Sequence, residues 1–282
     1  MPLRIVQSKQ NARLKDLRKA LANPGRESRS GAHLLAGIEG PNLLQEALRA
    51  SLTVDCVFVA QGAEHLLDSL ALPPQTEILL LPRELLDSIL TTEAPQPIAA
   101  LVEPPEWTWT HLLGGQQNLS PLVLVLAGLQ DPGNLGAILR SAEAFGADGI
   151  LALPGTVSAW NPKAVRASAG SVFRLPLLAA TAINSIARLR EAGLRIFATT
   201  PGAAEPANLV DLSGPIALLI GNEGNGVPQP LSAMADCSIT IPCPGPVESL
   251  NAAVAASVLL YEASRQRSLR AGIPPDLQRG KQ

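Results

Sequence analysis

Short apolar runs alternate with segments of helical periodicity along most of this chain. The first segment is a predicted helix over residues 9–22, in which Leu14, Leu17 and Leu21 share one face. Beyond it, apolar runs predict strands and the segments between them predict helices, which together indicate a small α/β domain. The predicted strands are 33–38, 54–60, 78–81 and 98–102, and the predicted helices are 41–49, 63–70 and 83–90.

A second series of the same kind begins at Pro121. Strands that are separated by helices pair in parallel, so this series predicts a mostly parallel sheet with helices on both faces. The predicted strands are 122–126, 150–153, 174–178, 194–199, 216–220 and 238–241. The predicted helices are 134–145, 162–169, 183–192, a short one after Pro228, and a long one over 249–266.

These two series set the predicted domain boundaries. Residues 1–103 form a small α/β domain with a basic amino-terminal arm, and residues 121–267 form the second domain. The stretch 104–120 is rich in Pro and Gly, which indicates a linker with one anchored turn. Residues 268–282 are a polar tail.

The composition is that of a globular protein, with 46% hydrophobic and 16% charged residues. The longest apolar runs are strand-sized and far too short to cross a membrane. The amino terminus lacks the apolar segment of a secretory signal. Cys56, Cys237 and Cys243 show no paired spacing, which argues against disulfides or a zinc site and for a reducing compartment. We therefore expect a cytoplasmic protein without a membrane or metal partner.

Positive charge is concentrated at the amino terminus. Residues 1–30 carry eight Lys and Arg against two acids, although the whole chain has a net charge of −2. Such a segment predicts contacts with the phosphates of a nucleic acid, but a solvated helix face with a free arm explains it equally well. The candidate RNA-contacting residues are Arg4, Arg13, Lys15, Arg18 and Lys19.

Three patches rich in Gly and Asn each follow a predicted strand of the second series. They are 131–136 running on to Arg140, the stretch 220–226, and 241–242 followed by 249–251. Loops at the carboxyl ends of parallel strands are where open α/β sheets bind ligands. The three patches therefore predict one composite pocket.

The first patch leads into a helix whose predicted N-cap is Asn134. Arg140 lies on the polar face of that helix, where a guanidinium near a Gly-lined helix start can clamp a phosphate or an oxyanion. A solvated Arg140 paired with Glu143 is the alternative.

In the second patch, Glu223 either accepts hydrogen bonds from backbone N–H groups of its loop or acts as an acid in the functional site. For the loop as a whole, the alternative to a ligand-binding loop is an ordinary turn. In the third, Ser249 is the predicted N-cap of the long helix, and Asn251 falls in its first turn. The apolar stripe of this helix consists of Leu250, Val254, Val258 and Tyr261. The many alanines that flank the stripe allow close approach of another helix, which suits a buried helix or a helix-to-helix dimer contact.

Several enzyme classes are excluded by what the second series lacks. The three histidines all precede residue 121, so no Ser/His or Cys/His pair is available there. The chain contains no HExxH, Walker A or CxxC motif. A hydrolase or a metalloenzyme is therefore disfavoured.

Taken together, the patches resemble the three signature motifs of the SpoU (TrmH-like) RNA methyltransferases of the SPOUT superfamily. The resemblance covers roughly residues 121–263 and includes the intermediate segment 163–170. The first domain also resembles, more weakly, the small RNA-binding module of the family, at residues 13–14 and 37–40.

The resemblance implies a trefoil-knotted α/β domain, S-adenosylmethionine as methyl donor, and a ribose 2'-hydroxyl of RNA as acceptor. It also implies a homodimer with the site near the interface. The implied RNA is ribosomal, with transfer RNA as the alternative. The implied catalytic residues are Arg140, Asn134, Glu223, Ser249 and Asn251. The implied cofactor-binding residues are Thr199, Thr200, Gly202, Ile220, Gly221, Asn222, Ile241, Leu250, Asn251 and Ala253.

Two other functions stay open. A non-catalytic RNA-binding dimer of the same fold would not need Asn134, Arg140 and Glu223 together. A nucleotide-binding oxidoreductase would need a GxGxxG fingerprint, which the loop 221–226 does not match.

Overall fold

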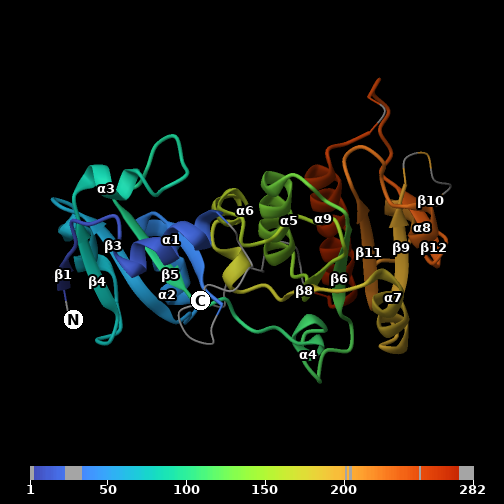
Figure 1. The fold of residues 1–282 in the computed structure, drawn as a ribbon. Coiled ribbons are helices and arrows are strands. Elements are labelled where there is room, and N and C mark those ends of the chain that lie inside the picture. The colour runs from blue at the N-terminus through green and yellow to red at the C-terminus, as the bar shows by residue number, and fades with distance from the viewer. Residues whose placement is uncertain (1–2, 23–33, 201, 203–204, 248, 273–282) are drawn as a thin grey trace. The chain divides into compact units, whose positions relative to one another are not determined.

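The computed structural model describes residues 3–22, 34–200, 202, 205–247 and 249–272. The chain divides into two units, each described here by itself (Figure 1). Unit 1 comprises Met1–Glu106 with Ser158–Arg174, and unit 2 comprises Trp107–Val157 with Leu175–Gln282. Parts of the predicted basic arm (23–33) and polar tail (273–282) lie outside the described residues.

Unit 1 contains a five-stranded sheet in the order β1-β4-β3-β5-β2. β1, β4 and β3 run parallel, whereas β5 runs antiparallel to β3 and β2. The three-residue β1 was too short to be predicted from the apolar pattern, while the longer runs were predicted as strands. The strands are β1 (Leu3–Ile5), β2 (Ala36–Glu39), β3 (Val54–Ala60), β4 (Glu77–Leu81) and β5 (Ile98–Val102).

The helices of unit 1 follow the predicted pattern. α2 has the predicted bounds, and the other helices are shorter than predicted. α1 buries Leu14, Leu17 and Leu21, the predicted apolar face. Two predicted α-helices were wrong in type or extent, because 63–70 contains only a 3-10 helix and 83–90 contains one turn of α-helix. The helices are α1 (Ala12–Ala22), α2 (Pro41–Arg49), η1 (Glu64–Ser69) and α3 (Arg83–Asp87).

The segment 158–174 belongs to unit 1, although the predicted boundary left it in the second domain. It contains α6 (Pro162–Ser168) and η2 (Ser171–Phe173). The Arg174 guanidinium donates to Glu46 of α2 over 2.7 Å. Gly170 has φ +91°, and a side chain there would collide with that of Glu46. The ion pair and the close approach of Gly170 to Glu46 together attach this segment to α2.

Unit 2 contains a seven-stranded sheet in the order β10-β12-β9-β11-β6-β7-β8, in which every described pairing is parallel. This confirms the predicted mostly parallel sheet. The two-residue β10 was not predicted. The strands are β6 (Leu122–Ala127), β7 (Gly149–Ala152), β8 (Leu177–Ala179), β9 (Arg195–Thr199), β10 (Glu205–Pro206), β11 (Ile216–Gly221) and β12 (Cys237–Thr240).

Helices cover both faces of this sheet, as predicted. Val123, Val125 and Leu219 pack in one cluster with residues of α4, α7 and α8. Because successive strand residues alternate between faces, their neighbours point to the opposite side, where α5 and α9 lie side by side (Figure 1). The helices are α4 (Trp109–Leu112), α5 (Pro132–Ala144), α7 (Ala182–Glu191), η3 (Ala207–Leu209), α8 (Gln229–Ser232) and α9 (Ala252–Arg270).

Arg267, near the end of α9, forms hydrogen bonds with the segments that precede β6 and β11. Its guanidinium donates to the carbonyl oxygens of Ser120 and Gly214 over 2.6 Å each, and to that of Pro121 over 3.3 Å. These carbonyls precede β6 and β11, so one side chain satisfies the backbone at the start of two central strands.

We predict that Arg267→Met lowers the free energy of unfolding by about 2–4 kcal/mol, because three carbonyls lose a charged donor while the apolar stem is kept. The melting temperature measured by circular dichroism should fall by about 5–10 °C. Arg270→Met is the matched control, since exposed Arg270 bonds only the Ser213 hydroxyl among the described residues. Equal melting of the two variants would contradict this role of Arg267.

Candidate functional site

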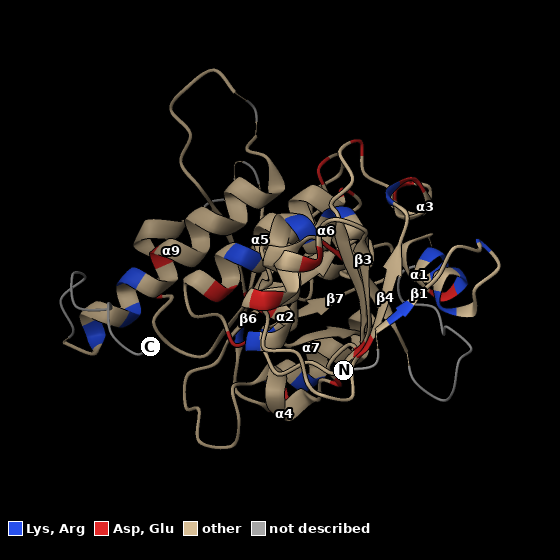
Figure 2. Cartoon of the chain, turned by 90° about the vertical axis from the view of Figure 1, so that its left-hand side faces the viewer, with Lys and Arg blue, Asp and Glu red and all other residues tan. Residues whose placement is uncertain are grey.

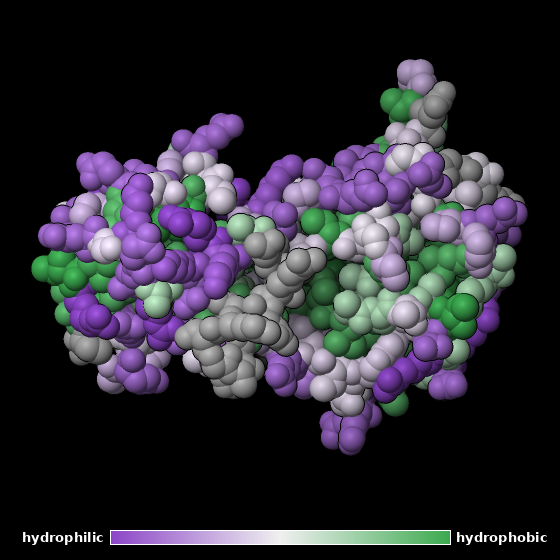
Figure 3. All heavy atoms as spheres, viewed as in Figure 1, coloured by the Kyte–Doolittle hydropathy of each residue, from purple (hydrophilic) through white to green (hydrophobic). Residues whose placement is uncertain are grey.

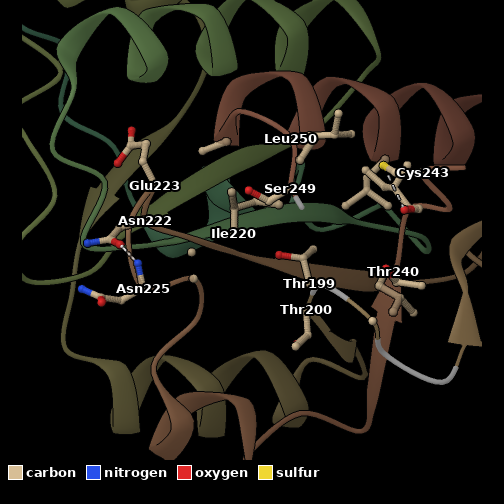
Figure 4. A pocket seen from close by; sticks show the side chains of 18 of the residues that line it. Thr199, Thr200, Ile220, Asn222, Glu223, Asn225, Thr240, Cys243, Ser249 and Leu250 are labelled. Carbon is tan, nitrogen blue, oxygen red and sulfur yellow. Dashed lines mark hydrogen bonds between the residues drawn. The ribbon is translucent and has the colours of Figure 1, made fainter. Parts of the chain in front are cut away.

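A cavity of about 620 Å³ lies at the carboxyl ends of β9, β11 and β12 (Figure 4). Its walls come from the loops after these strands and from the start of α9. The sequence predicted one composite pocket from all three patches, but only the second and third patches line this cavity, and no residue of 131–140 does. Eight of the ten predicted cofactor residues line it, namely Thr199, Thr200, Gly202, Ile220, Gly221, Asn222, Ile241 and Leu250.

The loop after β11 forms a tight rim of this cavity. The Asn222 side-chain oxygen accepts from the backbone N–H groups of Gly224 and Asn225, at 3.0 and 2.7 Å. Backbone hydrogen bonds between Asn222 and Gly226 close the loop, and Gly226 has φ +63°. A side chain at Gly221 would overlap the backbone of Gly226 and Val227. The glycines therefore permit a fold of the loop that larger residues exclude.

The part of the cavity wall across from this loop contains both apolar and polar residues. The Thr199 hydroxyl donates to the Leu219 carbonyl over 2.8 Å, which holds the end of β9 against β11. Figure 4 shows Ile220, Ser249 and Leu250 facing the space above Thr199 and Thr200. Thr240, Cys243 and Val247 also line the cavity but were not predicted, because nothing in the sequence distinguishes them from ordinary loop residues.

A hydrogen-bonded chain of three side chains joins the three patches. The Asn251 amide donates to the Asn134 side-chain oxygen over 3.1 Å. The Asn134 amide in turn donates to the Glu223 carboxylate over 2.7 Å. Three of the predicted catalytic residues are thus held in fixed relative positions, with Glu223 at the edge of the cavity.

Both predicted helix caps were wrong. The N-cap of α5 is Asp131, whose carboxylate accepts from the Asn134 N–H over 2.8 Å, rather than Asn134 itself. The N-cap of α9 is Asn251, which accepts from the N–H groups of the next turn, rather than Ser249. An Asp followed by Pro at the first helical position is a typical cap signal that would have identified Asp131. Ser249 lines the cavity instead.

Arg140 is not part of this cluster. It lies six residues after Asn134 on α5, nearly two turns along and on a different side of the helix. Its side chain is exposed and has no hydrogen bond or ion pair among the described residues, so the alternative pairing with Glu143 is not formed. Arg140 and Asn134 do not line the cavity, and neither do Asn251 and Ala253.

An apolar stripe on α9 is open to solvent. Val254, Val258 and Tyr261 recur at i, i+4 and i+7 and are 49%, 40% and 55% exposed. Figure 3 shows a separate gathering of hydrophobic residues, on the face of unit 2 that is turned toward the viewer there. The buried face of α9 consists of other residues, among them Ala256, Leu259 and Leu260. The stripe is thus not buried within the chain, whereas the alanines Ala252, Ala253 and Ala256 of the same helix are.

The predicted RNA-contacting residues of unit 1 fall into two groups (Figure 2). Arg13 is half-buried and pairs with Asp55 and Glu77, and Arg4 also pairs with Glu77. Burial alone would lower the pKa of Arg13, but these two carboxylates outweigh it and raise the pKa. The side chains left open to solvent on α1 are Lys15, Arg18 and Lys19.

The described residues provide neither a cluster of metal ligands nor a membrane-spanning helix. They contain no group of three or more His, Cys, Asp or Glu side chains that could hold a metal ion. Within the same part of the chain, every helix is too short or too polar to cross a membrane.

Comparison with protein families identifies both halves of the chain. Residues 38–108 match the family described as RNA 2'-O ribose methyltransferase substrate binding. Residues 121–261, half of the chain, match the SpoU rRNA methylase family. The chain belongs to the SpoU rRNA methylase family. This confirms the family that the three motifs resemble.

Curated relatives of this SpoU protein resemble it over most of its length. The 23S rRNA (guanosine(2553)-2'-O)-methyltransferase RlmP of Bacillus subtilis is 31% identical, over 91% of this chain and 97% of the relative. An uncharacterized tRNA/rRNA methyltransferase of Mycolicibacterium vanbaalenii is 35% identical, over 81% of this chain and 76% of the relative.

Solved structures share the fold of the whole SpoU chain. The methyltransferase AviRb from Streptomyces viridochromogenes, in complex with AdoMet, aligns with a TM-score of 0.78 at 29% identity, over 92% of this chain and 98% of that one. An AdoMet-bound rRNA methyltransferase from Sinorhizobium meliloti aligns with a TM-score of 0.79 at 28% identity, over 93% and 98%. The chain is an S-adenosylmethionine-dependent RNA 2'-O-methyltransferase.

The double role of Asn251 generates a prediction about stability. Asn251→Ala removes the cap of α9 and the bond to Asn134, and should lower the free energy of unfolding by about 1–2 kcal/mol. Asn251→Ser keeps a capping oxygen but loses the amide, so its melting temperature should stay near that of the wild type. If circular dichroism shows both variants equally destabilised, the cap is not what Asn251 contributes.

Proposed function

We propose that this protein methylates a ribose 2'-hydroxyl of ribosomal RNA. The relative from Bacillus subtilis acts on 23S rRNA by its name and spans 91% of this chain, including both units. Transfer RNA is the alternative substrate, which the names of the mycobacterial relatives leave open. The observation that carries the proposed site is the cavity that brings together the loops of the second and third motifs.

The residues of this cavity fit S-adenosylmethionine. Its volume lies within the ~300–1,000 Å³ of small-molecule sites, and its walls combine apolar side chains with open backbone groups. Ile220 and Leu250 offer apolar contact, and the glycines of the loop after β11 let its backbone lie close to a bound molecule. When bound, S-adenosylmethionine supplies an activated methyl group. The predicted cofactor residues Asn251 and Ala253 contribute indirectly, by shaping the start of α9.

We assign Arg140 the task of binding RNA at the reacting ribose. A guanidinium is a poor base because it keeps its proton throughout the physiological pH range, so proton removal falls to the RNA phosphate or to water. Arg140 instead holds a phosphate of the acceptor and stabilises negative charge that develops on the 2'-oxygen. Having no intramolecular partner among the described residues, its side chain is available for this role.

The hydrogen-bonded chain of Asn251, Asn134 and Glu223 then positions the acceptor. It fixes the start of α5 and the loop after β11 relative to the start of α9. Ser249 lines the cavity and shapes its entrance. Holding the reacting atoms in line is where most of the acceleration of a direct transfer comes from. On α1, the exposed Lys15, Arg18 and Lys19 are proposed to contact RNA phosphates.

We further propose a homodimer through α9. The exposed stripe of Val254, Val258 and Tyr261 is an apolar helix face of the kind that pairs with a second copy. Arg140 lies outside its own cavity, which supports a site completed by the partner chain. The trefoil knot that the motifs imply stays a prediction.

Activity tests the role of Arg140. Arg140→Ala should lower tritiated methyl transfer to bulk RNA at least ~100-fold, because losing one charge-stabilising donor costs ~3 kcal/mol. Calorimetry should show unchanged S-adenosylmethionine binding. Arg188→Ala is the control, since exposed Arg188 only lies over the Trp109 ring. Full activity of Arg140→Ala would refute the mechanism, and methylation of transfer RNA alone would refute the substrate.

Association tests the dimer. Val258→Glu places a charge in the apolar stripe and should raise the dimer dissociation constant ~100-fold or more, because an unpaired buried charge costs several kcal/mol. Sedimentation equilibrium measures it, with Leu209→Glu, an exposed apolar residue outside the stripe, as control. A wild-type monomer, or a Val258→Glu dimer of unchanged strength, would contradict this interface.

A further inference from the structure

Unit 2 contains a second cavity that the transfer reaction does not use. Its volume is about 470 Å³, and it lies at the carboxyl ends of β6 and β7, beside the starts of α7 and α8. Six of the residues that line it are Gln130, Pro154, Ile183, Asn225, Pro228 and Met234. None of these six belongs to the predicted catalytic or cofactor-binding residues.

The two cavities share one wall. Asn222, Asn225 and Gly226 line both, so only the loop after β11 separates the second cavity from the first. That loop is held closed by its own hydrogen bonds, which makes it a fixed partition. In Figure 4 the side-chain amides of Asn222 and Asn225 point away from Thr199 and Thr200, out of the first cavity. The second cavity therefore lies directly beside the first, on the other side of this loop.

The lining selects for a neutral, flat, partly apolar group. Among the described residues, no Lys, Arg, Asp or Glu lines this cavity, so a phosphate finds no counter-charge in this lining. Proline rings and the side chains of Ile183 and Met234 offer apolar surface, and Ile183 is 72% exposed although it is apolar. A nucleobase has this character, with apolar faces and a polar edge.

The cavity also contains polar groups that can form hydrogen bonds with the edge of a nucleobase. The side-chain amides of Gln130 and Asn225 have no hydrogen-bond partner among the described residues. Each amide both donates and accepts, as the edges of bases require. Pockets of this size with apolar walls and a few convergent polar groups are typical of small-ligand sites.

We propose that the second cavity holds a base of the RNA strand next to the methylated nucleotide. The assignment rests on the proposed function, because the strand must present its target ribose at the first cavity. Sequence-specific proteins recognise single-stranded RNA by displacing bases into pockets, where stacking and edge contacts identify them. The second cavity would thus contribute to the choice of target, whereas the first serves the reaction.

The test compares Ile183→Asp and Gln130→Ala with Leu209→Asp, which changes an exposed apolar residue that lines neither cavity. The substrate is total RNA from a strain lacking the gene, with methyl transfer measured against RNA concentration. We expect KM for RNA to rise about tenfold in the first two variants and to stay unchanged in the control. S-adenosylmethionine affinity, measured by calorimetry, should be equal in all.

A second measurement identifies the occupant. Once the methylated nucleotide is mapped, short RNAs with an abasic site on either side of it are compared. The wild type should lose affinity for one of them, and Ile183→Asp should not distinguish it from the intact RNA. An unchanged KM in both variants, or equal abasic losses in wild type and Ile183→Asp, would overturn the assignment and leave the cavity to a protein partner. A wild type inactive on every RNA would instead overturn the proposed function.

Discussion

Parallel pairing of the central strands of unit 2 determines where its chemistry can occur. β11 pairs with β6 on one side and β9 on the other, so the loops after these strands emerge at one edge of the sheet. Each loop arrives from a different part of the sequence, yet the sheet register fixes their spacing to that of neighbouring strands. The cavity, its rim and the contact between Asn134 and Glu223 all depend on this arrangement. Arg267 supports it from the opposite edge.

Much of the fold follows from the sequence because burial has a strong periodic signal. Fully buried strands such as β6 and β11 are continuous apolar runs, and their bounds were predicted to within a residue. Caps were predicted less well. Asn134 and Ser249 have the right chemistry for capping, but so do Asp131 and Asn251, and the choice among neighbouring candidates depends on where the first helical turn closes. The segment 158–174 could not be placed because its partner Glu46 is over a hundred residues away.

The candidate site, like the fold, could be predicted only in part. Gly and Asn patterns identified the loops after β11 and β12 that line the cavity, since a tight loop restricts residue type. The exposure of Val254 and Val258 could not be predicted, because an apolar helical stripe has the same pattern whether it packs within its own chain or against another. Arg140 illustrates the remaining gap, since its motif marks it as functional while its own chain gives it no partner among the described residues. A residue that acts on an external molecule leaves no trace in intramolecular contacts.

Attachment of the segment 158–174 to α2 has a consequence for how this protein can be divided or recombined. The chain passes from one unit to the other three times, at residues 106, 157 and 174, rather than once. Neither unit is therefore a continuous stretch of sequence that could be exchanged between relatives by joining genes end to end. A transplanted front half would leave behind the piece that covers Glu46. An exchange of the first unit between relatives must therefore carry the segment between β7 and β8 along with it.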